Sequence, residues 1–190
     1  MGSASSAPVS TTIRRRSAST CWRWARLGNI SDKITDGSHN PPPNTGSGYP
    51  VISAKNIKNG HISFENVDRF TDERGFEKEN QRTRITRGDI IMGIIGGSIG
   101  NVGVYDHDEK VIAQRSIAII HPLIDVEYLV FSLKSPLIQD YLHATAAGSA
   151  QGGIYLGTLM SILIPLPPLA EQKRIVARLE ELLPLCERLR

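Results

Sequence analysis

Short apolar runs separated by turn residues occupy the middle of the chain. The segment YPVISAK predicts a strand at residues 49–55, and the Asn59-Gly60 pair that follows favours a type I′ hairpin turn. Two further apolar segments, residues 90–106 and 110–122, are rich in isoleucine and valine, and the first is punctuated by glycine. Their pattern predicts buried strands with close backbone approaches at the glycines.

A helical spacing replaces this pattern after residue 125. Apolar residues recur there at intervals that place them on one face, namely Leu129, Leu133, Leu137, Ile138, Tyr141 and Leu142. Pro136 predicts that the helix breaks or restarts within this stretch. The segment SILIPLPP, residues 161–168, then predicts a short strand.

The last segment predicts an amphipathic helix that begins at Pro168, with Glu171 in the first turn. Its apolar stripe has the spacing of a coiled coil and consists of Ile175, Leu179, Leu182, Cys186 and Leu189. Pro184 is expected to kink the helix. The stripe fits two interpretations: a helix that lies on its own domain, or one that pairs with a partner. Its position after a proline-rich strut favours the partner.

Two loops and a leader complete the organisation. Residues 1–20 offer little apolar surface and are expected to form a disordered leader. Residues 36–50 contain three consecutive prolines and three glycines, which predict a long surface loop that forms neither a helix nor a central strand. A second loop is predicted at residues 148–155. The fold class is therefore α+β: a β-rich domain with a few helices at residues 21–167, followed by an amphipathic, coiled-coil-type helix at residues 168–190.

The basic charge of the chain is concentrated at its start. The whole sequence carries a formal charge of +3, but residues 29–164 contain 12 basic and 15 acidic residues. Any contact with DNA must therefore come from local basic clusters. The two cysteines, Cys21 and Cys186, lie far apart and suggest no metal pair. Because no apolar run is long enough to span a membrane, a soluble, cytoplasmic protein without membrane contact is expected.

Motifs for catalysis are incomplete in this sequence. The glycines of residues 93–103 match neither a phosphate loop nor a dinucleotide fingerprint. Asn40-Pro41-Pro42-Pro43 lacks the aromatic residue of the Asn-Pro-Pro-aromatic motif of adenine methyltransferases, and Glu171-Gln172-Lys173 lacks the partner carboxylate of a nuclease site. We therefore expect no catalytic residue, no metal and no cofactor.

Polar side chains on the predicted loops are the remaining candidates for function. Arginine pairs with guanine and asparagine or glutamine with adenine through two hydrogen bonds, whereas lysine favours phosphate. The residues of this kind that form the candidate DNA-binding set are Ser38, His39, Lys55, Asn56, Lys58, Arg82, Arg84, Ser98, Asn101, Gln114, Arg115, Ser149 and Gln151. Any solvated loop surface carries some of these residue types, so a purely structural role remains the alternative for each.

The segment IPLPPLAEQKRIVARLEELLPLCERL, residues 164–189, resembles the junction between a target-recognition domain and the spacer helix in specificity subunits of type I restriction–modification enzymes. Upstream segments look like the rest of the same domain in the same order: WARLGNISDKITDGSHNPP, YPVISAKNIKNGHI, RGDIIMGIIGGSIGNVGVYD and GSAQGGIYLGTLMSILIPLPPL. The resemblance covers about residues 22–190 and is most specific in PLPPLAEQKRIV.

This resemblance implies a non-catalytic chain that reads one half of a split target in double-stranded DNA. It also implies partners: methyltransferase subunits, and through them the restriction subunit. Family members typically carry two recognition domains, whereas this chain has one and the start of one helix, so a second copy or a second recognition domain is an expected partner. The residues assigned to that helix interface are Gln172, Ile175, Leu179, Leu182, Cys186 and Leu189. The competing hypotheses are a scaffold module that never touches DNA, and a DNA-modifying enzyme.

Overall fold

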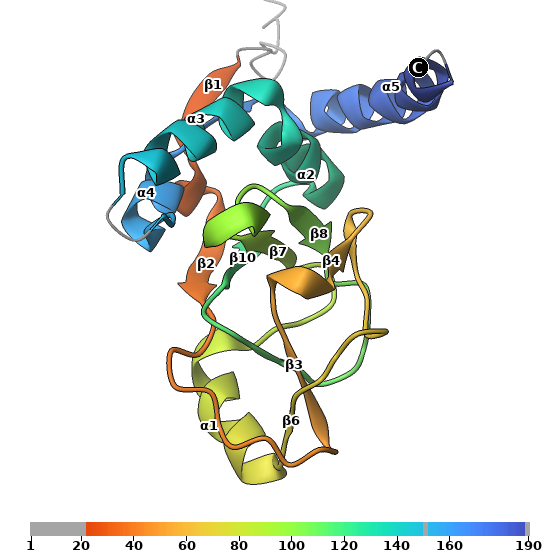
Figure 1. The fold of residues 1–190 in the computed structure, drawn as a ribbon. Coiled ribbons are helices and arrows are strands. Elements are labelled where there is room, and N and C mark those ends of the chain that lie inside the picture. The colour runs from red at the N-terminus through yellow and green to blue at the C-terminus, as the bar shows by residue number, and fades with distance from the viewer. Residues whose placement is uncertain (1–21, 150–151, 189–190) are drawn as a thin grey trace, which may run out of the picture.

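The central element of the fold is a six-stranded sheet that crosses the middle of the molecule (Figure 1). A computed structural model describes residues 22–149 and 152–188. The predicted leader therefore lies outside the described residues, and the first described element starts at Arg23. The strands of the sheet, in spatial order, are β2 (Ser31–Asp36), β10 (Ile117–Pro122), β7 (Ile90–Gly93), β8 (Val102–Val104), β5 (His61–Ile62) and β4 (Ile57–Lys58).

Strands β10 and β7, inside the sheet, are buried on both faces, which explains their unbroken apolar sequence. On β10, Ala118 and Ile120 join the core beneath the helices, whereas Ile117 and Ile119 join a second core on the opposite face. Side chains alternate between faces along a strand, so one apolar run supplies both cores. The predicted hairpin is confirmed: β4 pairs with β5, and Asn59 and Gly60 both adopt positive φ.

Two smaller sheets flank the central one. Strand β1 (Arg23–Arg26) pairs with β11 (Leu163–Leu166), and β3 (Tyr49–Ile52) lies between β6 (Phe70–Thr71) and β9 (Ile112–Ala113). Residues 37–48 of the predicted loop form no helix and none of the named strands, as expected, and only its ends, Asp36 and Tyr49–Pro50, belong to strands. Pro50 is tolerated because Tyr49 and Pro50 face β6 alone, while Val51 and Ile52 pair with β9, so the proline does not interrupt a ladder on both sides.

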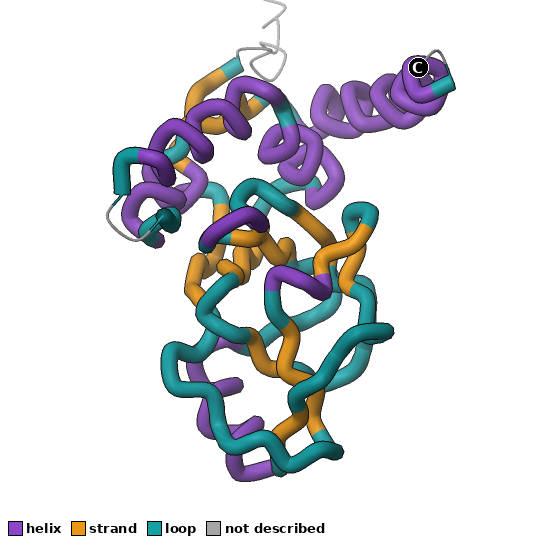
Figure 2. The backbone as a smooth tube through the Cα atoms, in the orientation of Figure 1, coloured by secondary structure: helices purple, strands orange, loops and turns teal. Residues whose placement is uncertain are grey.

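The α-helices gather at the two ends of the molecule, with α1 (Glu73–Thr83) at one end and the others at the opposite end (Figure 2). The restart at Pro136 is confirmed, because α2 (Val126–Lys134) ends two residues before it and Pro136 opens α3 (Pro136–Ala147). Two helices were not predicted, α1 and α4 (Leu156–Ser161). Three 3₁₀ turns complete the described elements: η1 (Leu27–Asn29), η2 (Ala54–Asn56) and η3 (Gly96–Ser98).

The final helix, α5 (Leu169–Glu187), has two different halves. Its first turns pack on α2, where Val176 is buried and Ile175 is partly buried against the core. Its last turns point away from the body (Figure 1), and Leu182 and Cys186 are exposed there. The helix runs on through Pro184. The first half of the helix therefore packs on its own domain. In the described part of the second half, the apolar stripe is exposed.

Gln172 was predicted to belong to the partner interface, but it is buried against its own domain. Its side chain is 4% exposed, accepts a hydrogen bond from the Asp125 backbone N–H at 3.2 Å and donates one to the Pro167 carbonyl at 2.9 Å. These bonds fasten α5 to its own domain. Leu189 of the predicted stripe lies outside the described residues. Among the described helices none is both long and apolar enough to cross a membrane.

Candidate nucleic-acid interface

Four loops that are far apart in sequence are tied together on one side of the central sheet. Ser38 exchanges backbone hydrogen bonds with the 113–115 segment: its N–H donates to Ala113 at 2.6 Å, and its carbonyl accepts from Arg115 at 3.1 Å. The glycine loop, residues 94–101, is tied in the same way to residues 152–154. Because the Ile94 N–H also donates to the Ser116 carbonyl at 3.0 Å, the backbone brings the start of the 37–48 loop, the glycine loop, residues 113–116 and residues 152–155 to one place.

The first of these crossings requires glycine. A Cβ atom at Gly37 would lie 2.0 Å from the carbonyl oxygen of Gln114, a distance far shorter than any that real Cβ atoms adopt. The absence of a side chain lets the two backbones cross in contact. Gly37 therefore fixes where the proline-rich loop leaves β2, next to Arg115.

A hollow of about 700 Å³ lies between these loops, and we call it the Arg115 hollow. Arg115, His39 and Tyr155 are exposed side chains on its wall. Its lining consists of Asp36, His39, Ile94, Ile95, Arg115, Gly153, Ile154, Tyr155 and Leu156. Apolar walls with a few convergent polar groups are typical of a binding site. The side chain of Arg115 makes no hydrogen bond or ion pair with any residue in the described part of the chain, so its donors are available to a ligand.

The carboxylate of Asp36 holds two of the predicted residues. It accepts from His39 Nε2 at 2.6 Å and from Arg82 Nη1 at 2.8 Å. Burial raises the pKa of Asp36, but the hydrogen bonds from His39 and Arg82 outweigh it and leave the pKa below its usual value. The Asp36 carboxylate is therefore ionised at neutral pH, and it orients the exposed His39 ring beside the hollow.

Arg82 is a correction to the candidate DNA-binding set. Besides the carboxylate, its Nη1 donates to the Asp36 carbonyl at 2.7 Å and to Thr35 Oγ1 at 3.1 Å. These bonds join the end of α1 to β2. Because its Nη1 is engaged within the fold, Arg82 holds two elements together, and that role explains the residue without a contact to a base.

Asn56 and Ser38 are also removed from the set by burial. Asn56 is 1% exposed, accepts from the Ser53 N–H at 2.9 Å and donates to the Ser63 carbonyl at 3.0 Å. It closes the capping box of η2. Ser38 is 3% exposed and contributes through its backbone.

The other predicted residues lie in different environments. Ser98 and Ser149 use their hydroxyls to bond nearby carbonyls, of Ile95 at 2.8 Å and Ala146 at 3.0 Å, and so stabilise their own loops. Lys55 pairs with Asp68 at 2.6 Å on the surface, and Arg84 lines a separate hollow beside Arg87. Gln114 is half-buried next to Arg115, and Gln151 lies outside the described residues.

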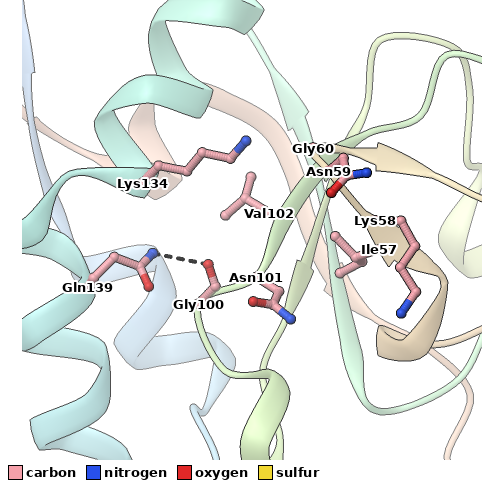
Figure 3. A pocket seen from close by; sticks show the side chains of 9 residues that line it. All are labelled: Ile57, Lys58, Asn59, Gly60, Gly100, Asn101, Val102, Lys134 and Gln139. Atoms are coloured by element: carbon pink, nitrogen blue, oxygen red, sulfur yellow. Dashed lines mark hydrogen bonds between the residues drawn. The ribbon is translucent and has the colours of Figure 1, made fainter. Parts of the chain in front are cut away.

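Lys58 and Asn101 line a second hollow, of about 560 Å³, which we call the Lys134 hollow (Figure 3). The glycine loop separates the two hollows, because its start lines one and its end lines the other. Sequence reasoning missed Lys134, Gln139 and Asn59 here, and Tyr155 in the first hollow. Asn59 belongs to a recognised hairpin and Tyr155 to a recognised loop, but Lys134 and Gln139 lie on predicted helices, where nothing distinguishes them from other surface residues.

A mixed α/β module with loops gathered around two hollows that carry polar side chains is typical of a binding domain. Comparison with known proteins makes this specific. The family model for the type I restriction modification DNA specificity domain matches residues 24–188, and the chain belongs to this family.

Its relatives are longer proteins. The EcoBI specificity subunit of Escherichia coli is 27% identical over 85% of this chain and 35% of its own length, and the EcoKI specificity subunit of E. coli strain K12 is 32% identical over 70% and 29%. The crystal structure of the HsdS subunit from Thermoanaerobacter tengcongensis shares the fold, with a TM-score of 0.64 and 23% identity over 93% of this chain and 41% of that one. The chain thus spans about a third of the length of the curated relatives it matches.

Proposed function

We propose that this chain reads the base sequence of one part of a double-stranded DNA target and holds other subunits at that place. The observation that carries the proposal is the Arg115 hollow, where four loops converge and present an unpaired arginine beside an oriented histidine and an exposed tyrosine. Family membership supports the same reading, because the matched domain is described as a DNA specificity domain.

In this proposal the residues around the hollow have different tasks. Arg115 contacts guanine through two hydrogen bonds, and the neighbouring Gln114 suits adenine. His39 and Tyr155 lie on the walls of the same hollow and contact base edges or sugar from its rim. The chain makes and breaks no covalent bond, and the chemistry belongs to the subunits it positions.

The exposed second half of α5 is the proposed docking element for those subunits. Leu182, Leu183 and Leu185 are 38%, 43% and 45% exposed, an apolar surface that a partner helix can cover. We assign this surface to the methyltransferase subunits, which in turn recruit the restriction subunit, and to a helix from a second copy or a second recognition domain.

Selection from a random duplex library tests the reading function. Arg115→Ala is expected to reduce discrimination at one or two base positions by about tenfold, or ~1.4 kcal/mol, because one two-point contact is lost. Arg74→Ala, which removes an exposed arginine from α1, is the matched control and should leave the selected sequence unchanged. If the wild-type chain retains no sequence preference, alone or with its methyltransferase subunits, the reading function is rejected and a scaffold role remains.

The docking assignment has a separate test. Leu182→Ser should weaken co-purification of the chain with its methyltransferase subunits or a second recognition domain, because it places a polar group in the apolar surface. Leu123→Ser changes an equally apolar residue that is 65% exposed, outside α5, and should have no effect. Equal recovery of partners with both variants would contradict the assignment.

A further inference from the structure

The Lys134 hollow is built by three parts of the chain that meet from different directions. Figure 3 shows the tip of the β4–β5 hairpin on one side, the end of the glycine loop below it, and the junction of α2 and α3 opposite. Lys58, Asn59, Asn101 and Lys134 are among the residues that line it, and Figure 3 shows the Lys134 ammonium directed toward the hairpin tip.

The charge in this hollow is of one sign. Its lining includes two lysines and no acidic residue, although residues 29–164 carry more acidic than basic side chains. Lys58 and Lys134 are exposed, and neither forms a hydrogen bond or ion pair with any residue that the structure describes. Two cations without counterions beside the same space form a local site for an anion.

The surrounding backbone is held in place. Gln139 donates from Nε2 to the Gly100 carbonyl at 3.0 Å and to the Leu133 carbonyl at 2.8 Å, which ties the glycine loop to the α2–α3 junction. Gly100 has φ +84°, and a Cβ there would lie 2.1 Å from Gln139 Oε1, so glycine is required for this contact. The loop therefore presents Asn101 from a fixed position.

Lys134 reaches the tip of the hairpin. Its Nζ lies 3.0 Å from the position that a Cβ on Gly60 would occupy. Lys134 is the last residue of α2, where a cation offsets the helix dipole. That role alone requires neither a second lysine across the hollow nor two amides beside it.

We propose that the Lys134 hollow binds a phosphodiester group of the DNA duplex whose bases face the Arg115 hollow. This inference rests on the proposed function. Lysine ammonium groups are suited to phosphate as point charges, and the amides of Asn59 and Asn101 donate to its oxygens. The glycine loop forms a wall of both hollows, so base edges meet one side of it and the backbone of the same groove meets the other.

The salt dependence of duplex binding tests the proposal. Affinity of the full chain is measured between 50 and 200 mM salt for the wild type, Lys134→Ala and the control Lys78→Ala, which removes an exposed lysine from α1. Lys134→Ala should reduce the slope of log affinity against log salt by about 1 and weaken binding to all sequences by about fivefold to tenfold at 0.1 M salt. The base preference of Lys134→Ala should match that of the wild type. The control Lys78→Ala should match the wild type in its slope.

Other outcomes overturn the proposal in distinguishable ways. An unchanged slope for Lys134→Ala, with Arg115→Ala still altering base preference, rejects the phosphate site and leaves the reading function intact. A changed base preference for Lys134→Ala makes the residue a base reader instead. If duplex binding is unaffected but inorganic phosphate shifts the Asn101 amide resonance only in the wild type, the hollow takes a free phosphate ligand. A thermal melt equal to that of the wild type excludes misfolding as the cause of lost binding.

Discussion

The junction of α1 with the central sheet and the surface on either side of the glycine loop are both rich in charged side chains, but they use them differently. At the junction, Arg82 donates three hydrogen bonds to β2, and His121 lies between the Asp89 carboxylate, at 2.8 Å, and the Thr83 carbonyl, at 3.1 Å. Beside the glycine loop, the side chains of Arg115 and Lys134 form no hydrogen bond or ion pair with any described residue.

Residue type alone does not distinguish these two situations, whereas hydrogen-bond satisfaction does. A buried or half-buried charge costs free energy unless it is paired, so the charged side chains at the junction form hydrogen bonds within the fold and stabilise it. An exposed arginine in a hollow pays no such cost and keeps its donors for a ligand. Arginine therefore links two elements of the fold at position 82 and is a candidate base-contacting residue at position 115.

The largest expected effect concerns Arg82. Arg82→Ala should lower the free energy of unfolding by about 2–3 kcal/mol, because it removes the bonds to β2 and leaves the Asp36 carboxylate with one partner fewer. Denaturant unfolding measures this, with Arg74→Ala as the control that should change little. The DNA sequence selected by the folded variant should be that of the wild type. Normal stability with an altered base preference would instead make Arg82 a DNA contact and end the distinction between the two regions.

A smaller effect is expected from pH at the same junction. Both partners of His121 accept hydrogen bonds, which favours the doubly protonated ring, and the hydrogen bond to Asp89 raises the pKa of His121 despite its burial. A raised pKa in the folded state means that this stabilisation is complete below about pH 6.5, the unfolded value, and is lost as pH rises through the folded pKa. Stability should therefore fall from mildly acidic to mildly alkaline pH.

Urea unfolding at pH 5.5, 7.0 and 8.5 measures the trend. His121→Gln should flatten it, whereas His143→Gln, a change at an exposed histidine on α3, should leave it as in the wild type. A wild-type profile that rises across the same interval would show that His121 is neutral in the folded chain.

Local sequence signals predicted much of the secondary structure because their causes are local. The Asn59-Gly60 turn, the helix restart at Pro136 and the buried strands at Ile90 and Ile117 each follow from backbone preference or apolar periodicity. Helix α1 was missed because its buried face consists of Gly75, Phe76, Glu79 and Thr83, and only one of these is a large apolar residue. Helix α4 was missed because it is only six residues long.

The candidate site was predictable in part. The loops that form it were recognised from their glycines and prolines, and the structure brings the predicted residues His39 and Arg115 to one hollow, although their contact with DNA stays a prediction. Asn56 and Arg82 were assigned to the same surface, because nothing in the sequence reveals that Asn56 caps its own turn or that Asp36 lies within reach of Arg82. Lys134 was overlooked because a lysine at the end of a helix is common.

The sequence by itself determined the segments that fold locally, the α+β class and the family resemblance, because turns, helix starts and apolar periods are properties of neighbouring residues. Only the tertiary structure decided which polar side chains are free. That depends on partners such as Asp36 and Arg82, which are 46 residues apart in the chain and meet only when α1 packs against the sheet. It is also what separates Gln172, fastened to its own domain, from Leu182, exposed on the same helix.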